Sequence, residues 1–162
     1  MTQRVDLATV MDRLAIDEVV TGYAVAVDDG DWAAYRSLFA PGGRADYTSA
    51  GGIEGPAGEV AEWLAETMKL FPVRQHLIVN RLVRLENRVG WPADLAEVRA
   101  DFVNPMRLDT GGAESGAGTG AAATAPNFTA AGRYTFALAR TAHDGWRLTR
   151  VTVHEKWRHL SP

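Results

Sequence analysis

Apolar residues at helical spacing run along the first part of the chain. From about Leu7 to Asp29 they recur every three or four positions, which predicts a helix that buries one face. Gly30 accepts positive φ and is expected to end this helix. Asp31 then predicts the N-cap of a second helix over Trp32 to Phe39. A third helix is expected from Pro56 to about Leu70, because proline suits the first helical position.

The second half of the chain changes to the pattern of strands. A short strand is expected first, over Arg44 to Ser49, and longer ones follow over Val73 to Glu86, Leu95 to Leu108, Thr129 to Thr141 and Trp146 to Trp157. Pro105 should bend or interrupt one of them, and Asp144-Gly145 is a strong hairpin turn signal. Three helices before a mixed, mostly antiparallel sheet predict an α+β fold. A curved sheet of this kind would form a half-open cone around one apolar pocket.

One segment differs from the rest in composition. Asp109 to Asn127 consists almost entirely of Gly, Ala, Ser and Thr and has no large apolar residue. Such a stretch buries too little surface to offset its ordering entropy, so we expect a flexible loop between two strands and not a domain linker. Residues 1–162 are then a single domain, which the length also favours.

Charge and composition exclude several classes of protein. The 17 basic and 20 acidic residues give a net charge of −3, which argues against nucleic-acid binding. The chain has no cysteine, so disulfides, thiolate metal sites and a cysteine nucleophile are excluded. No apolar run is long enough to span a membrane, and the acidic N-terminus does not resemble a signal peptide. We therefore expect a cytoplasmic protein.

Two residues are the first candidates for chemistry. His76 lies in an apolar strand, where partial desolvation favours the neutral imidazole that can accept a proton. Asp28 lies at the C-terminus of the first helix, where the macrodipole disfavours a carboxylate, and a histidine is a natural partner for it. The pattern alone leaves open a structural histidine in the core and a solvated carboxylate at the helix end.

Tyrosines and apolar residues complete the expected pocket. Tyr23 and Tyr47 could line one cavity and donate a hydrogen bond to a carbonyl, although core packing is the alternative for each. The polar residues Asp101 and Asn104 interrupt an apolar strand and could face either the cavity or the outside, and both are candidate substrate-binding residues. The expected apolar lining is Trp63, Phe39, Met68, Ile78 and Phe136. No nucleotide-binding motif and no metal-ligand spacing is visible, so we expect neither a cofactor nor a metal.

The order of short motifs along the chain resembles a known family. Asp28-Asp29-Gly30-Asp31-Trp32, Phe39-Ala40-Pro41, Arg44-Ala45-Asp46-Tyr47, Arg74-Gln75-His76-Leu77 and Asp144-Gly145-Trp146-Arg147 follow each other as in the SnoaL-like branch of the nuclear transport factor 2-like superfamily. Within that branch the chain looks most like scytalone dehydratase and bile acid 7α-dehydratase. The resemblance implies a catalytic Asp28 and His76, with Tyr23 as in the bile acid enzyme or Tyr47 as in scytalone dehydratase.

The resemblance and the residues together give an expected function. It is a cofactor-independent dehydratase or isomerase that acts next to a carbonyl of a hydrophobic polycyclic substrate, steroid-like or polyketide-like. The alternatives are a non-catalytic ligand-binding or scaffold protein and a partner resembling a dioxygenase β-subunit, because the fold alone does not determine function. Apolar residues on both faces of the last strands, including Val151, Val153 and Trp157, predict a homodimer or homotrimer.

Overall fold

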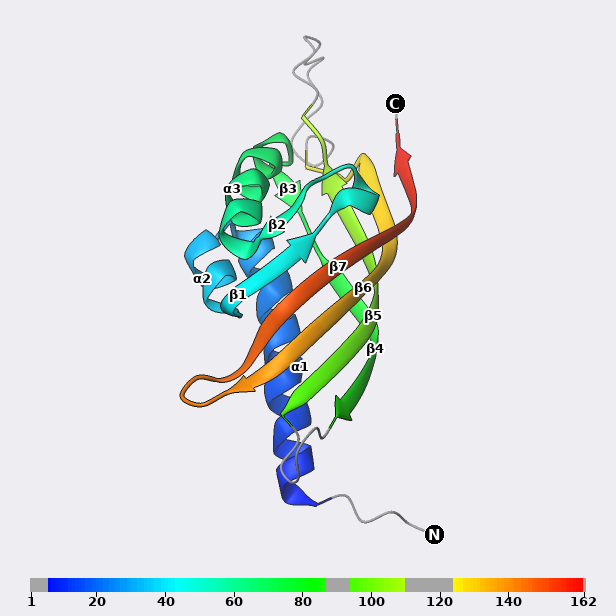
Figure 1. Ribbon diagram of the computed structural model, residues 1–162. Coiled ribbons are helices and arrows are strands. Elements are labelled where there is room, and N and C mark those ends of the chain that lie inside the picture. The colour runs from blue at the N-terminus through cyan, green and yellow to red at the C-terminus, as the bar shows by residue number, and fades with distance from the viewer. Residues whose placement is uncertain (1–5, 87–93, 110–123, 162) are drawn as a thin grey trace.

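The computed structural model describes residues 6–86, 94–109 and 124–161 (Figure 1). A long N-terminal helix lies against one face of a curved sheet, and two shorter helices cover one end of the sheet. The predicted glycine- and alanine-rich loop falls mostly on residues outside these ranges. Within the described residues no helix combines the length and the apolar character needed to cross a bilayer.

The helices follow from their capping residues. Helix α1 (Leu7–Asp29) begins where the Asp6 side chain accepts the Thr9 N–H, and it ends at Gly30, which adopts φ 67°. Helix α2 (Trp32–Ser37) is capped by Asp31, whose carboxylate accepts the Ala34 N–H at 2.9 Å. These boundaries confirm the predicted caps. Helix α2 ends before Phe39, however, because that residue already belongs to the first strand.

The remaining short elements form one cap over the end of the sheet. A 3₁₀ turn, η1 (Thr48–Ala50), follows the first strand, and helix α3 (Ala57–Thr67) continues directly into a second 3₁₀ turn, η2 (Met68–Leu70). The predicted third helix is therefore present but is tightened over its last three residues. In Figure 1 this cap lies at the upper left, near the upper end of α1.

The sheet is mixed and mostly antiparallel, as predicted. Its strands are β1 (Phe39–Asp46), β2 (Glu54–Pro56), β3 (Val73–Arg74), β4 (Leu77–Glu86), β5 (Leu95–Arg107), β6 (Phe128–Thr141) and β7 (Gly145–Leu160). Their order is β2-β1-β7-β6-β5-β3, and β4 also pairs with β5. Only the β1–β7 pair is parallel among those recorded for the described strands.

Two strand predictions needed correction. The expected strand over Val73 to Glu86 is split into β3 and β4, with Gln75 and His76 between them. Pro105, expected to bend or interrupt its strand, does not interrupt it, because it lies inside β5 and pairs with Thr129 of β6. On its other side, the registers of β3 and β4 place Pro105 opposite the gap between those two strands. A residue without an N–H is tolerated there, because the neighbouring ladder is already interrupted.

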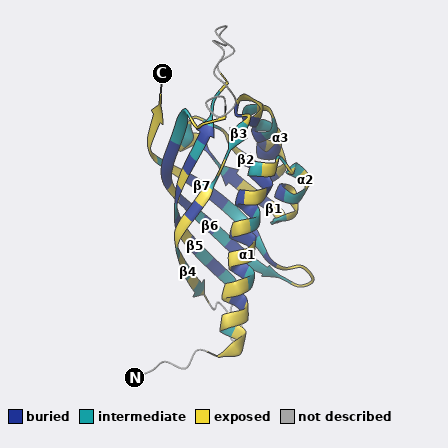
Figure 2. Cartoon of the chain, turned by 180° about the vertical axis from the view of Figure 1, so that it is seen from behind, coloured by how far each residue is buried: buried dark blue, intermediate teal, exposed yellow. Residues whose placement is uncertain are grey.

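The core lies between α1 and the concave face of the sheet. Figure 2 shows the buried side of α1 turned toward the strands and its opposite side exposed. Ile16, Val20 and Val27 from the helix are buried together with alternate residues of the strands, such as Phe136 and Val151. Complete burial of side chains of this size contributes about 1.5–3 kcal/mol each. This packing fixes the position of the C-terminal end of α1, where Asp28 lies.

Candidate active site

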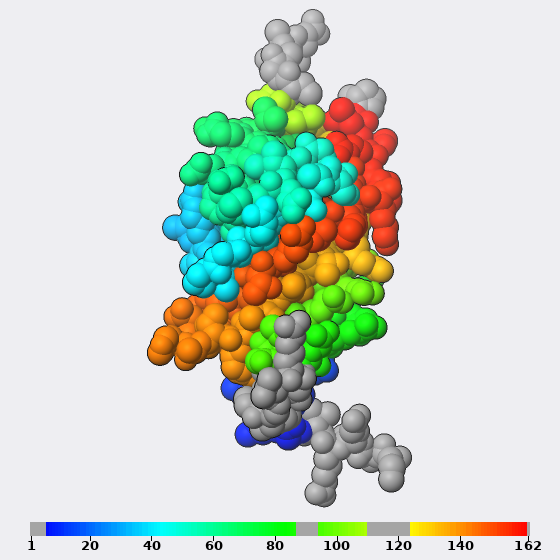
Figure 3. Space-filling view, in the orientation of Figure 1, coloured from blue at the N-terminus to red at the C-terminus, as the bar shows by residue number. Residues whose placement is uncertain are grey.

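A cavity of about 320 Å³ remains between the helical cap and the concave face of the sheet. The predicted site residues His76, Tyr47, Trp63, Met68 and Asn104 all line it. Most of the other lining residues are apolar, including Leu64, Phe71, Phe102 and Val153. The space-filling view shows the cap, cyan to green, beside the upper, red part of β7 (Figure 3). The cavity therefore combines an apolar wall with a small number of polar groups.

His76 and Asp28 meet at this cavity. The His76 Nδ1 lies 2.6 Å from Asp28 Oδ1, and the His76 backbone N–H donates to Asp28 Oδ2 at 2.9 Å. The His76 side chain is 8% exposed and that of Asp28 is 22% exposed. No described residue forms a hydrogen bond with Nε2 of the ring. The carboxylate thus fixes the ring through one nitrogen and leaves the other for a ligand.

Nearby hydrogen-bond donors stabilise the Asp28 carboxylate at the C-terminal end of α1. A negative charge at a helix C-terminus is unfavourable, so Asp28 needs donors. The gap between β3 and β4 presents both the ring and the backbone N–H of His76 to it. Arg74 supports the same helix end, because its Nε donates to the Asp28 carbonyl at 2.8 Å. Gly30 leaves room for this arginine, since a Cβ there would lie 2.8 Å from the guanidinium.

The tyrosines form a buried polar group beside the dyad. The Tyr23 hydroxyl is hydrogen-bonded to the Tyr47 hydroxyl, and Tyr23 is only 1% exposed. Tyr47 and Tyr134 line the cavity, whereas Tyr23 lies behind them in the core. Burial raises the pKa of Tyr134 to about 12, partly offset by hydrogen bonds with Asn104 and Tyr23. Burial also raises the pKa of Tyr23 and Tyr47 well above the usual 10.

These positions distinguish the roles of the two predicted tyrosines. Tyr47 faces the cavity and can reach a ligand, as expected. Tyr23 does not line the cavity and can act only through its hydrogen bond to Tyr47, so it is a positioning residue. Tyr134 was not predicted from the sequence, because it lies in a strand where an aromatic residue is ordinary. All three hydroxyls stay protonated near neutral pH and are therefore hydrogen-bond donors.

A bulge brings a charged pair to the cavity. The pairing of β6 with β7 shifts between Ala131 and Gly132, so Lys156 is an extra residue and both Glu155 and Arg158 line the cavity. Arg158 Nε donates to Glu155 at 2.6 Å. A Cβ at Gly132 would lie 2.0 Å from the His154 carbonyl oxygen, so the bulge requires glycine. A glycine inside a strand was the signal that could have located this site.

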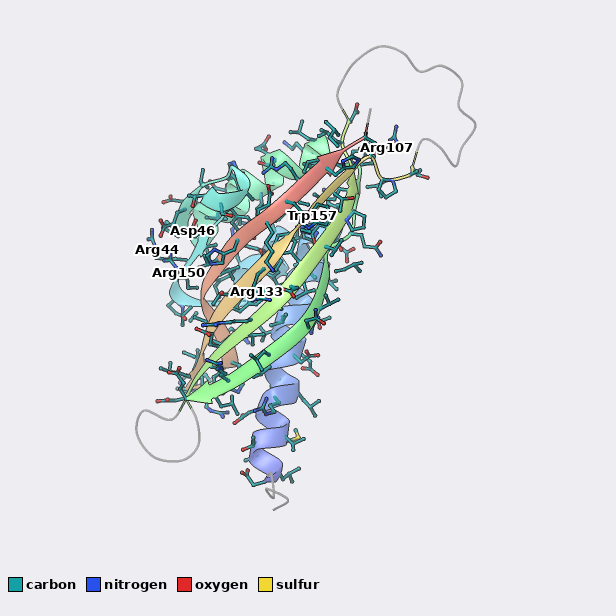
Figure 4. The ribbon with its side chains drawn as sticks, turned by 90° about the vertical axis from the view of Figure 1, so that its right-hand side faces the viewer. Arg44, Asp46, Arg107, Arg133, Arg150 and Trp157 are labelled. Carbon is teal, nitrogen blue, oxygen red and sulfur yellow. The ribbon has the colours of Figure 1, made fainter. Side chains whose placement is uncertain are left out.

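Four predicted lining residues lie elsewhere. Phe39 packs against Tyr35 outside the cavity, with ring centroids 5.2 Å apart. Ile78 and Phe136 are buried in the closed core and do not line the cavity. Asp101 is on the opposite face of the sheet, where it pairs with Arg133 at 2.8 Å, because the alternation of β5 turns Phe102 inward. Figure 4 labels Arg133 of β6, the partner of Asp101, and Trp157 of β7.

The described residues hold no cluster of three or more histidine and acidic side chains arranged to bind a metal. The groups that can do chemistry at the cavity are the imidazole, its carboxylate partner, two phenols, one amide and one charged pair. This set can accept a proton, stabilise the resulting imidazolium and donate hydrogen bonds to a developing negative charge.

The sequence of this chain is similar to a known domain family and to proteins of two mycobacteria. The SnoaL-like domain family matches residues 8–152. Uncharacterized proteins of Mycobacterium tuberculosis and Mycobacterium bovis are 31% identical over 100 residues, which is 62% of this chain. The chain spans 64% of the length of these curated relatives.

Solved structures confirm the predicted fold. A Salmonella enterica protein of the nuclear transport factor 2-like superfamily aligns with a TM-score of 0.68 at 18% identity, over 90% of this chain and 91% of that one. A hexachlorocyclohexane dehydrochlorinase (LinA type 2) aligns with a TM-score of 0.71 at 18% identity, over 98% of both chains. A candidate scytalone dehydratase of Novosphingobium aromaticivorans aligns with a TM-score of 0.65 at 13% identity, over 94% of this chain and 93% of that one. At these identities the likeness establishes the fold.

Proposed function

Because this chain belongs to the SnoaL-like domain family, whose fold alone does not determine an activity, we propose one from its site: His76 removes a proton next to a carbonyl of a hydrophobic substrate. Loss of water or isomerisation follows, and the reaction uses only side chains of this chain. One observation carries the proposal. A histidine held by a carboxylate at 2.6 Å lines a mostly apolar cavity.

The steps follow from the geometry. Nε2 of His76 takes the proton from the carbon next to the carbonyl, and the electron pair moves onto the carbonyl oxygen. Asp28 stabilises the imidazolium through Nδ1, while the Tyr47 or Tyr134 hydroxyl donates to the enolate oxygen. In a dehydration the enolate re-forms its carbonyl, the carbon–oxygen bond of a β-hydroxyl breaks, and the imidazolium returns the proton to form water. In an isomerisation the proton returns to another carbon.

The lining supports a hydrophobic substrate with more than one ring. Trp63, Leu64, Phe71 and Phe102 supply apolar and aromatic surface, and the volume falls at the lower end of the range for small-molecule sites. Proteins with the same fold are named as a dehydrochlorinase and a candidate dehydratase. Both names denote eliminations, and loss of water, one of the two outcomes that we propose, is an elimination as well. A steroid-like or a polyketide-like ketone fits the same chemistry.

The test is turnover of a bicyclic β-hydroxy ketone, 3-hydroxy-1-tetralone, whose loss of water gives 1-naphthol. We expect formation of 1-naphthol to be accelerated by the protein and lowered about 10²–10⁴-fold by His76→Ala. His154→Ala is the matched control, because His154 is an exposed residue of β7 that does not line the cavity. Equal rates for the wild type and His76→Ala would instead favour a binding or scaffold protein.

We also propose that the outer face of the sheet binds a second copy of this chain. Leu77, Val103, Ala131 and Trp157 follow one another across β4, β5, β6 and β7 in the strand register. Trp157 is 51% exposed, which is unusual for a tryptophan. The neighbouring row carries Asp101, Arg133 and Lys156, so the face presents both signs of charge and can complement itself.

A further inference from the structure

Asn104 is the exception on the concave face of β5. The other residues of this face are apolar, namely Ala96, Val98, Ala100, Phe102 and Met106. Asn104 is 4% exposed, yet its Oδ1 has no hydrogen-bond partner among the described residues. Buried amides in native proteins are nearly always satisfied. An acceptor left open at a cavity wall indicates that the partner comes from the ligand.

A buried tyrosine hydroxyl lies next to the amide of Asn104. Asn104 and Tyr23 both lie close enough to the Tyr134 hydroxyl to lower its pKa, which partly offsets the effect of burial. Tyr23 bonds to Tyr47, so one chain of polar groups runs from β5 to the end of β1. The carbonyl oxygen of Asn104 is the group left without a partner among the described residues. That oxygen accepts hydrogen bonds and donates none.

The strand register places Asn104 beside the base. Arg74 pairs with Met106 in β3, and Leu77 pairs with Val103 in β4. Both registers bring His76 opposite Asn104, and both residues line the cavity. Facing residues of antiparallel strands lie about 5 Å apart at their Cα atoms. A substrate group bound by Asn104 is therefore within a few bonds of the carbon from which His76 takes its proton.

We infer that Asn104 is a specificity-determining residue that accepts a hydrogen bond from a hydroxyl group of the substrate. The inference rests on the proposed function and narrows its substrate class to hydroxylated carbonyl compounds. It also favours dehydration over isomerisation, because the bound hydroxyl lies near the acidic carbon and can be the leaving group. When Asn104 holds the hydroxyl hydrogen, the lone pairs of the oxygen are free to accept the proton from the His76 imidazolium, and water leaves.

The test compares the affinities of two ketones that differ by one hydroxyl, 3-hydroxy-1-tetralone and 1-tetralone. Dissociation constants are measured by ligand-observed NMR in a His76→Gln background, so that proton removal does not consume the ligand. Asn104→Leu removes the acceptor at similar volume. Met106→Leu is the matched control, because Met106 lies on the same face of β5 and lines the same cavity.

We expect the background protein to bind the hydroxylated ketone at least about tenfold more tightly, as one well-placed hydrogen bond allows. Asn104→Leu should abolish this preference while 1-tetralone binds within about threefold of the background, and Met106→Leu should keep the preference. Equal affinity for both ketones in the background, or a preference that survives Asn104→Leu, would show that Asn104 binds only water. Binding of neither ketone would contradict the substrate class. This test measures affinity and the test of the proposed function measures turnover, so the failure of one can be distinguished from the failure of the other.

Discussion

The Asp28 carboxylate holds His76 at two points, the ring Nδ1 at 2.6 Å and the backbone N–H at 2.9 Å. One carboxylate therefore sets both the position of the chain between β3 and β4 and the orientation of the ring. A histidine that only filled space in the core would need neither contact. This double contact joins the C-terminal end of α1 to the sheet at the cavity.

Asp28→Asn should lower turnover of 3-hydroxy-1-tetralone by about 10²–10³-fold, because a neutral amide stabilises the imidazolium poorly. It should also reduce the free energy of unfolding by about 1–3 kcal/mol, since charge-assisted hydrogen bonds to the His76 N–H and ring are weakened. Initial rates and urea unfolding measure the two effects. Asp29→Asn, at an exposed neighbouring position, should change neither. A fully active Asp28→Asn protein would contradict this role.

The four tyrosines should resist ionisation in the folded protein. Burial raises the pKa of Tyr134 from 10 to about 12, and it raises the pKa values of Tyr23, Tyr35 and Tyr47 as well. Each phenol holds its proton more tightly in the folded chain than in the unfolded chain. This contribution to stability is therefore complete below pH 10 and is lost as the pH rises from 10 through about 12.

Phenolate absorbance measured during an alkaline titration checks this expectation. The native protein should show little phenolate at pH 10, and the signal should rise together with the loss of the circular dichroism spectrum. The chain unfolded in urea supplies the control, because its tyrosines should titrate near 10. Half ionisation of the folded protein at pH 10 would contradict the burial of these phenols.

Much of the fold could be predicted from local signals. Asp6, Gly30 and Asp31 cap helices through their own backbone geometry, so the boundaries at these residues depend little on the rest of the chain. The Asp144-Gly145 turn likewise predicted the last hairpin. The split between β3 and β4 could not be predicted, because it depends on contacts with a distant part of the chain. The Arg74 side chain donates to the Asp28 carbonyl, 46 residues away, and the Asp28 carboxylate bonds to His76.

The candidate site was predictable only in part, and for a similar reason. His76 and Asp28 each stood out as a polar residue in an unfavourable position, and the structure brings them together. The direction in which a strand residue points depends on register, so the sequence left the face of Asp101 open, and its candidate role in substrate binding is not supported by its position on the outer face. Glu155 and Arg158 reach the cavity only because of a bulge that Gly132 permits in the partner strand.

Gly132→Ala should therefore destabilise the protein by about 1–3 kcal/mol, because the new Cβ would lie 2.0 Å from the His154 carbonyl oxygen and the strands must separate. Thermal unfolding measures the change. Gly58→Ala is the matched control: nothing lies within 4 Å of its Cβ, and it sits in α3, where alanine should be neutral or stabilising by up to about 1 kcal/mol. Equal stability of the two variants would contradict the close approach at the bulge.

Trp157→Arg should weaken self-association by at least about tenfold in dissociation constant, since it places a charge in the apolar row of the outer face. Sedimentation velocity over a range of concentrations measures this. Leu14→Arg is the control, because Leu14 is a comparably exposed apolar residue on the solvent side of α1. A wild-type protein that stays monomeric at every concentration would contradict the proposed interface.

The central claim is that His76 removes a proton next to a carbonyl inside the cavity. Exchange of the hydrogens at the carbon next to the carbonyl of 1-tetralone, followed by NMR in D₂O, tests it without requiring any leaving group. We predict that the wild-type protein accelerates this exchange and that His76→Ala lowers the rate about 10²–10⁴-fold while the fold is kept. Exchange that the wild type does not accelerate, or that His76→Ala leaves unchanged, would contradict the account.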